Sequence, residues 1–379
     1  MSLRYLLEQE IRERRSIPFS RYMEMCLYHP EFGYYSRNAE QFGKAGDFYT
    51  SSDVHAVFGR LLARQFEEIW RVLGSPPKIE IVELGPGRGL FAQDVLDWSQ
   101  KKFPAFSQAL HYSLLEGSAA LRGRLEQTLA RFIESGRASL LVDMRALATP
   151  GPAIVFANEF FDALPVEILG VEGKLAIALQ DNRFTEIWTP PAPEELKFLD
   201  QYGVHPEPGE LIEVPLQAHR YMSSLADSLC NGIVIAIDYG YTRQEQIAGR
   251  HRGTLMAYRE HSAGTNPYEA PGEQDITAHV NFTSLSAAAE QNGMMAQPLL
   301  TQSQFLMGIG EKDQFADAFA DCRLPQERAK VALQLKHLVT PAGMGESFQV
   351  MVAAKNIENR QIADLSGLSF ARSRLPGMA

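Results

Sequence analysis

The chain has 379 residues, of which 45% are hydrophobic and 22% charged, and its formal net charge is −10. This length exceeds what one simple core needs, so we expect two subregions within an ordinary globular enzyme. The acidic balance argues against non-specific nucleic-acid binding, which depends on neutralising phosphate groups.

The first 77 residues are predicted to be mainly helical and to carry a loop that covers a ligand. Helices are expected at residues 3–14, 18–27 and 57–73, the last with one apolar face. Residues 46–51 (Gly-Asp-Phe-Tyr-Thr-Ser) form a polar segment with two aromatic residues. Loops of this kind often close over a ligand, although this one could equally be a turn and a helix cap.

A buried strand is predicted at residues 79–84, followed by a glycine-rich turn and a helix at 90–103. Gly85, Gly87 and Gly89 permit a tight turn and let a ligand approach the backbone, at the N-terminus of the helix. Such a turn builds a nucleotide-like site at the carboxyl edge of a parallel sheet. The spacing differs from G-x-G-x-x-G, and the Lys-Ser/Thr pair of a phosphate-binding loop is missing.

Glu83, two residues before the first glycine, indicates the charge of the ligand. A carboxylate there would repel a pyrophosphate but would suit a cation. S-adenosylmethionine (SAM) fits, because it carries an ammonium and a sulfonium and has no phosphate. The alternative is a strand-end acid satisfied by local N–H groups.

Further strands are expected at residues 110–115, 138–142, 153–157, 233–237 and 348–354. They alternate with helices, which predicts an α/β fold with a Rossmann-like doubly wound sheet. Its halves would be residues 78–165 and 231–360. We expect residues 166–230 to form an inserted substrate lobe, residues 241–285 an irregular insert and residues 361–379 a disordered end.

Acidic residues follow the second and third strands, where a doubly wound sheet places ligand groups. Glu116 could accept hydrogen bonds from two ribose hydroxyls, and Asp143 could accept one from an adenine amino group. Each could instead be a solvent-facing acid or a helix cap.

The fourth strand ends in a segment suited to orienting a nitrogen acceptor. Asn158, Glu159 and Asp162 supply an amide oxygen and two carboxylates, which can position an acceptor and take up its proton. These three are the candidate catalytic residues. Alternatively, Phe160 and Phe161 are core residues and Asp162 is a cap.

No metal site, disulfide framework or membrane span is expected. Cys26, Cys230 and Cys322 are far apart and form no C-x-x-C pair. No run of eighteen apolar residues and no signal-peptide pattern is present, so a cytoplasmic location is predicted. Histidines and acids that could ligate a metal are too scattered, namely His29, His261, Asp275 and His279.

Seven segments in collinear order resemble the MidA-like family of SAM-dependent methyltransferases. The resemblance covers about residues 20–355 and rests on YHPEFGYY (28–35), GDFYTS (46–51), VELGPGRG (82–89), ANEFFDALPV (157–166), IDYG (237–240), GTLMAY (253–258) and PGEQDITAHV (271–280). The resemblance implies a seven-stranded class I methyltransferase sheet whose last strand is antiparallel. It also implies methylation of a protein arginine, as in mitochondrial members that assist assembly of respiratory complex I.

Two sets of site residues follow from these motifs. Cofactor contact is expected from Gly46, Asp47, Thr50, Glu83, Gly85, Pro86, Gly87, Gly89, Glu116, Asp143 and Asn158. Substrate contact is expected from Tyr258, His261, Asp275 and His279.

The chain departs from the family pattern at two places. The family usually has Ser-Pro-Glu where this chain has residues 51–53 (Ser-Ser-Asp), and Asp where this chain has Asn281. If that Asp binds substrate, its replacement affects arginine specificity.

The sequence thus predicts a SAM-dependent methyltransferase acting on a protein partner that presents an arginine, with no nucleic-acid partner. The alternatives are a non-catalytic SAM-binding assembly factor and a nucleotide-dependent oxidoreductase. The oligomeric state is left open, with a homodimer as one option.

Overall fold

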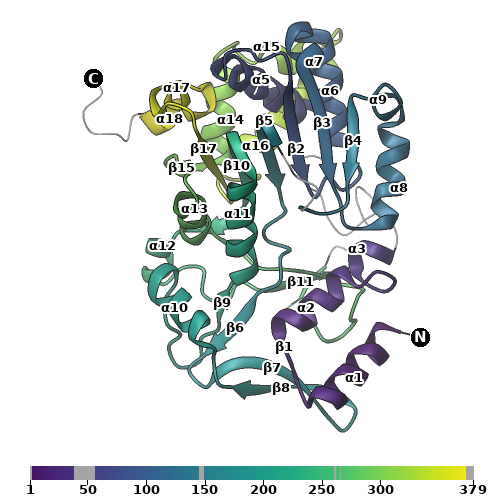
Figure 1. The fold of residues 1–379 in the computed structure, drawn as a ribbon, viewed down its shortest axis with the longest axis vertical. Helices are drawn as coiled ribbons and strands as arrows, with labels where there is room; N and C mark the ends of the chain where they lie inside the picture. Colours follow the sequence, from purple (N-terminus) through teal and green to yellow (C-terminus); the bar gives the residue numbers. More distant parts are fainter. Residues whose placement is uncertain (1, 38–55, 145–148, 260–261, 265, 373–379) are drawn as a thin grey trace.

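The computed structural model describes residues 2–37, 56–144, 149–259, 262–264 and 266–372. At its centre is a nine-stranded sheet of order β15-β17-β10-β5-β2-β3-β4, with β14 beside β10 and β16 beside β17 (Figure 1). Its strands are β2 (Ile79–Leu84), β3 (Leu110–Leu115), β4 (Ala138–Leu141), β5 (Thr149–Asn158), β10 (Leu229–Tyr241), β14 (Val280–Asn281), β15 (Met295–Ala296), β16 (Leu300–Thr301) and β17 (Phe348–Lys355).

Strand direction confirms the predicted fold class. β2, β3, β4, β5 and β10 pair in parallel, and β17 runs antiparallel to β10. β15 and β16 both pair antiparallel with β17, so the strand beyond β17 is split in two. The structure therefore has the expected doubly wound sheet with an antiparallel strand near one edge.

Two helical layers cover the sheet because successive strand residues point to opposite faces. Along β5, Ile154 and Phe156 join one apolar cluster, with α5 and α6, whereas Val155 joins the cluster on the other face, with α11 and α13. The first layer holds α5 (Ala56–Val72), α6 (Leu90–Lys102), α7 (Pro104–Ala109), α8 (Ala119–Thr128), α9 (Ala130–Glu134), α14 (Gln302–Glu311), α15 (Ala316–Phe319) and α16 (Pro325–Val339). The second holds α11 (Leu216–Ser228) and α13 (Phe282–Gln291).

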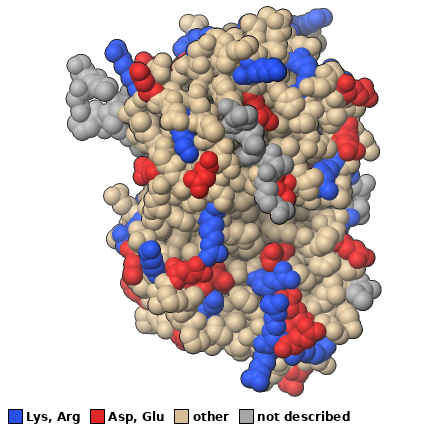
Figure 2. Space-filling view, in the orientation of Figure 1, with Lys and Arg blue, Asp and Glu red and all other residues tan. Residues whose placement is uncertain are grey.

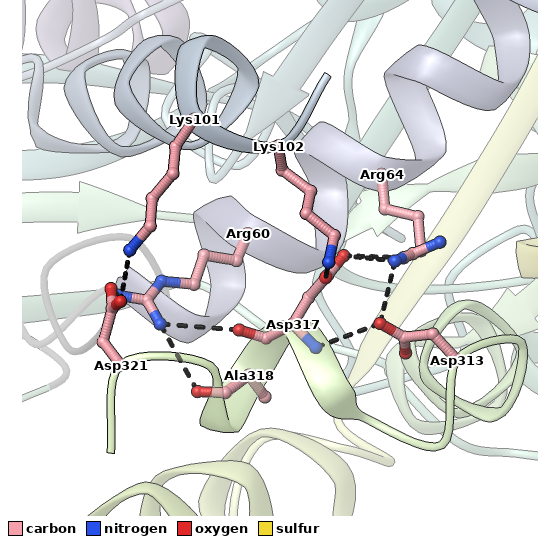
Figure 3. A network of polar contacts seen from close by, with 8 residues as sticks. All are labelled: Arg60, Arg64, Lys101, Lys102, Asp313, Asp317, Ala318 and Asp321. Carbon is pink, nitrogen blue, oxygen red and sulfur yellow. Dashed lines mark hydrogen bonds and ion pairs between the residues drawn. The ribbon is translucent and has the colours of Figure 1, made fainter. Parts of the chain in front are cut away.

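Within this first layer, a polar network joins α5 and α6 to residues 313–321, in and around α15 (Figure 3). Arg64 of α5 binds the carboxylates of Asp313 and Asp317, with its terminal nitrogen 2.9 and 2.6 Å from them. Arg60, also in α5, binds Asp321, which Lys101 of α6 reaches as well. The network lies on the side of the sheet formed by α5, α6 and α15.

The inserted lobe forms a second sheet together with the N-terminus. Its order is β1-β7-β6-β9, with β8 beside β7: β1 (Ile17–Pro18), β6 (Glu167–Gly170), β7 (Gly173–Gln180), β8 (Arg183–Thr189) and β9 (Ile212–Val214). Helices α1 (Leu3–Arg14), α2 (Phe19–Tyr28) and α3 (Tyr34–Arg37) lie on this lobe's side of the molecule, and α10 (Pro193–Tyr202) lies at its far end (Figure 1). The predicted 1–77 region is thus divided: α1 and α2 pack on the lobe, and α5 packs on the central sheet.

The predicted irregular insert contains a small sheet, and part of the predicted disordered end is helical. α12 (Arg243–Ile247), β11 (Met256–Arg259), β12 (Ser262–Gly264) and β13 (Asp275–Thr277) lie in the insert. α17 (Asn359–Ala363), η3 (Ser366–Leu368) and α18 (Ser369–Arg372) follow the last strand. The expectation of disorder from residue 361 is wrong up to residue 372, because Ile362, Leu365 and Leu368 are buried in the main core.

Figure 2 shows basic and acidic side chains interspersed over the visible face. Within the described ranges, every helix is too short or too polar to cross a bilayer.

Candidate methyl-transfer site

The turn from β2 to α6 has all three glycines in the left-handed region, with φ of 62°, 52° and 75° for Gly85, Gly87 and Gly89. Their surroundings differ. A Cβ on Gly85 would lie 2.9 Å from the ring of Phe160, and one on Gly89 would lie 2.7 Å from Leu125. A Cβ on Gly87 would meet no described atom within 4 Å. Gly87 is therefore the glycine that leaves open space for a ligand, whereas Gly89 permits close packing between α6 and α8.

A cavity of about 780 Å³ lies against this turn. It is bounded by the carboxyl ends of β3, β4 and β5, by α2, α3 and α11, and by β13. Lining residues from the central sheet include Gly85, Gly87, Leu115, Glu116, Asp143, Glu159, Phe160 and Asp162. Those from the covering elements include Glu24, Tyr28, Tyr35, Gln217, Tyr221 and Asp275. The volume and position are those of a small-molecule site at the edge of a doubly wound sheet.

The cavity wall includes the acids that follow β3 and β4. Glu116 is buried, and its Oε1 accepts a hydrogen bond of 2.8 Å from the N–H of Ser118. Burial raises the pKa of Glu116 to about 7. Asp143 also lines the cavity. The two predicted nucleoside contacts thus lie in one cavity with Gly87.

The same cavity gathers carboxylates and tyrosines from three separate segments. Glu159 and Asp162 follow β5, and Asp275 comes from β13. Tyr35 donates a hydrogen bond of 2.9 Å to Oδ1 of Asp275. Tyr28 donates one of 2.9 Å to the carbonyl of Ala163. Two predicted catalytic residues and one predicted substrate residue are therefore brought together.

Burial also shifts the pKa of Asp162. Burial raises this pKa to about 7, because the charged form of the carboxyl loses hydration inside the protein. A carboxyl group with a pKa near neutrality can exchange a proton at physiological pH.

Glu83, in contrast, is directed into the protein core. It lies on the same face of β2 as Ile79 and Ile81, is 5% exposed, and accepts a hydrogen bond of 2.8 Å from the hydroxyl of Tyr112. Burial raises the pKa of Glu83 to about 8, although the hydrogen bond from Tyr112 opposes this. Glu83 is not among the described cavity-lining residues, so its position does not support the prediction that its charge selects the ligand.

Several other predicted residues also lie off the described cavity lining, namely Pro86, Gly89, Asn158, Tyr258 and His279. Asn158 Nδ2 donates to the carboxylate of Glu159 at 2.9 Å. His279 Nδ1 lies 3.1 Å from Nδ1 of His251, and burial followed by the charge of His251 lowers its pKa to about 4. Tyr258 pairs in register with Asp275 across β11 and β13. Gly46, Asp47, Thr50 and His261 lie outside the described residues.

The family departure at Asn281 has a structural role. Its Oδ1 accepts from the N–H of Ser284 at 3.0 Å at the start of α13, and its Nδ2 donates to the carbonyl of Tyr202 at 2.8 Å. An aspartate could not donate that second bond. Asn281 is not among the described lining residues, so its replacement of Asp does not alter the cavity wall.

Several lining residues were not predicted from the sequence. Tyr28 and Tyr35 bound the YHPEFGYY segment, whose conspicuous pair of terminal tyrosines was the available signal. Gln217 and Tyr221 come from α11, which the sequence assigned to the inserted lobe but which packs on the central sheet. Nothing in the sequence near these two distinguishes them from other helical surface residues. The described residues contain no group of three or more His, Cys, Asp or Glu side chains placed to hold a metal ion.

A parallel sheet flanked by an antiparallel strand, a glycine turn and an acid after the next strand together define a class I SAM-dependent methyltransferase. Residues 61–299 match the family model for S-adenosyl-L-methionine-dependent methyltransferases. The chain belongs to this family, within its MidA-like branch. The oxidoreductase and non-catalytic alternatives are not favoured.

Known relatives agree with this assignment. The chain is 30% identical to a Drosophila melanogaster protein named protein arginine methyltransferase NDUFAF7 homolog, mitochondrial, covering 92% of this chain and 84% of the relative. It is 27% identical to the Homo sapiens protein arginine methyltransferase NDUFAF7, mitochondrial, over 91% and 81%. A Burkholderia thailandensis crystal structure bound to S-adenosyl-homocysteine superposes with a TM-score of 0.81 at 28% identity, over 97% of this chain and 94% of that one.

These relatives correct one prediction. A cytoplasmic location was expected from the absence of a signal pattern, but the curated relatives are named as mitochondrial proteins. The prediction of a cytoplasmic location is therefore contradicted. The cofactor is SAM.

Proposed function

We propose that this methyltransferase transfers methyl groups to an arginine side chain of a protein substrate. The observation that carries the proposal is that Glu159, Asp162 and Asp275 line one cavity together with Glu116 and Asp143. A guanidinium is a planar cation that carboxylates bind with paired hydrogen bonds. The names of the relatives, protein arginine methyltransferases, support the same acceptor.

We assign the cofactor end to Gly85, Gly87, Glu116 and Asp143. When bound, SAM supplies an electrophilic methyl group on its sulfonium. Gly87 leaves room beside the backbone, and Glu116 presents a carboxylate suited to a ribose diol. The contribution of these residues is to bind SAM and to orient it.

At the acceptor end, the side chains would orient a guanidinium and receive its proton. Asp162 is buried, and a pKa of about 7 lets it act as a proton acceptor near neutral pH. Tyr28 and Tyr35 stand with ring centroids 5.6 Å apart and can contact a cation through their faces. Tyr35 also holds the carboxylate of Asp275 in place.

Transfer of labelled methyl from SAM tests the acceptor. The purified protein is incubated with labelled SAM and a lysate of a strain lacking this protein, and labelled residues are identified by mass spectrometry. We expect label on arginine. Label only on other residue types would refute the proposed acceptor.

Asp162→Asn tests the acceptor end of the cavity. It should lower kcat by about 10²- to 10⁴-fold, the usual range for general acid–base groups, with SAM affinity little changed. Asp200→Asn is the matched control, because Asp200 lies on the exposed surface of α10 with a side chain 66% exposed. An Asp162→Asn enzyme with the control's rate would remove Asp162 from the proposed role.

A further inference from the structure

The side chain of Asp238 is buried outside the described cavity lining and is hydrogen-bonded to residues 160–162, which follow β5. Asp238 is 1% exposed, and its Oδ2 accepts hydrogen bonds from three consecutive backbone N–H groups. The donors are Phe160 at 3.2 Å, Phe161 at 2.9 Å and Asp162 at 3.3 Å. Its Oδ1 accepts from the N–H of Tyr239 at 2.9 Å. Three successive N–H groups turned toward one oxygen form an anion-binding concavity of backbone.

The position of Asp238 follows from where two neighbouring strands part. The last pair between β10 and β5 joins Ile237 to Asn158, and the N–H of Glu159 still donates to the carbonyl of Ile237 at 2.9 Å. Glu159 then adopts a φ of 51°, which a residue with a side chain seldom takes without compensation. The chain turns out of the sheet at this point, and Asp238, the next residue of β10, receives the N–H groups that the turn exposes.

Two further contacts hold the same segment from other directions. The N–H of Ala278, just after β13, donates to the carbonyl of Asp162 at 3.0 Å. The hydroxyl of Tyr28 in α2 donates to the carbonyl of Ala163 at 2.9 Å. Each of these two bonds is accepted by a single backbone carbonyl of the segment. Asp238, in contrast, accepts from three consecutive residues, and unlike Ala278 and Tyr28 it belongs to a strand of the central sheet.

We propose that Asp238 is a positioning residue for methyl transfer: it fixes the turn at residues 159–162, so that Glu159, Phe160 and Asp162 keep their places in the cavity. It acts through the backbone of these residues and not by touching either reactant. The residues assigned to the cofactor, Gly85, Gly87 and Glu116, follow β2 and β3, whereas the described hydrogen bonds of the Asp238 side chain come from Tyr239 and from residues 160–162. Its loss should therefore impair transfer far more than cofactor binding.

Asp238→Ala is the decisive variant. A misplacement of about 1 Å in a reacting group costs about 10²-fold in rate, so we expect kcat to fall by at least about that factor. SAM affinity by calorimetry should stay within about threefold of the parent protein. Hydrogen exchange at the amides of residues 160–162 should accelerate. Asp238→Asn keeps an oxygen acceptor without the charge and should lose less activity, which gives partial rescue.

The matched control is Asp317→Ala. Asp317 is also buried, and its Oδ2 accepts a hydrogen bond of 2.7 Å from Nε of Arg64. It lies in α15 within the network of Figure 3 and is not among the described cavity-lining residues. This variant should lower Tm while leaving kcat and exchange at residues 160–162 unchanged. A purely structural role for Asp238 would give the same pattern as this control and would overturn the proposal.

If Asp238→Ala does not fold, Asp238→Asn decides. The proposal then requires a fall in kcat with unchanged SAM affinity and faster exchange at residues 160–162, and an unchanged kcat rejects it. The proposal holds for whichever side chain accepts the methyl group. Label found on a residue other than arginine would refute the proposed acceptor while leaving the role of Asp238 to be judged by these measurements.

Discussion

Two buried glutamates, Glu83 in β2 and Glu116 directly after the adjacent β3, face different parts of the molecule. Glu116 lines the cavity, whereas Glu83 is bonded to Tyr112 within the core. Glu116→Ala should weaken SAM binding by about 1.5–3 kcal/mol, the range for a lost hydrogen bond to a charged group. Titration calorimetry measures this directly. An unchanged affinity would mean that Glu116 is only the acceptor for Ser118.

Glu83→Gln is the paired variant, because glutamine keeps an oxygen that can accept from Tyr112. We expect SAM affinity to stay close to that of the parent protein. A loss as large as that of Glu116→Ala would restore the role that the sequence assigned to Glu83.

The same variant carries a pH effect. A carboxyl whose pKa rises from 4.5 unfolded to about 8 folded binds its proton more tightly in the folded state. Its stabilising contribution is therefore full below about pH 4.5 and is lost as pH rises to about 8. Denaturant unfolding of the ligand-free protein at several pH values should show a shallower decline for Glu83→Gln than for the parent. Parallel curves would show that Glu83 does not titrate in this range.

At the scale of elements, the glycine turn separates binding from packing. Gly87→Ala places its Cβ in open space, so it should reduce SAM affinity while costing about 1 kcal/mol of stability for the left-handed backbone. Gly89→Ala places its Cβ 2.7 Å from Leu125. We expect that variant to lose a further 1–3 kcal/mol or so from overpacking between α6 and α8.

Thermal unfolding and calorimetry on both variants check this division. Equal losses of stability, or equal losses of SAM affinity, would show that the two glycines do not have separate roles.

The strands could be predicted from sequence because they are short apolar runs bounded by polar residues, and β2 and β3 were located to the residue. The acids after β3 and β5 could be predicted to lie together at one edge of the sheet, since parallel strands bring their carboxyl ends to that edge, and they line the cavity there. The direction of Glu83 could have been judged from the alternation of side chains along β2. The contributions of Tyr28 and Tyr221 could not, because they depend on how α2 and α11 fold over the edge, and Asp275 was expected only from the family resemblance.

At the scale of the whole molecule, the C-terminal helices close the core on the side of α5. Ser366 donates to the buried carboxylate of Glu68 through its backbone N–H at 3.0 Å and its hydroxyl at 2.5 Å. The N–H of Gly367 donates to Gln65 at 2.8 Å. Lys312, after α14, also binds Glu68 at 2.7 Å. Residues more than 240 positions apart in the sequence thus satisfy one buried acid, a pairing that the sequence near the C-terminus does not indicate.

Leu368→Ala tests whether this end contributes to the stability of the whole fold. Leu368 is 2% exposed within the main core, so its truncation should lower the free energy of unfolding by about 2–5 kcal/mol. Leu333→Ala is the control, because Leu333 on α16 is 68% exposed and its truncation should change the free energy by less than about 0.5 kcal/mol. Chemical unfolding followed by circular dichroism compares the two. If both variants unfold with the parent protein, the C-terminal helices are an attachment that the central sheet does not need; a loss confined to Leu368→Ala means that the sheet and its C-terminal closure unfold as one unit.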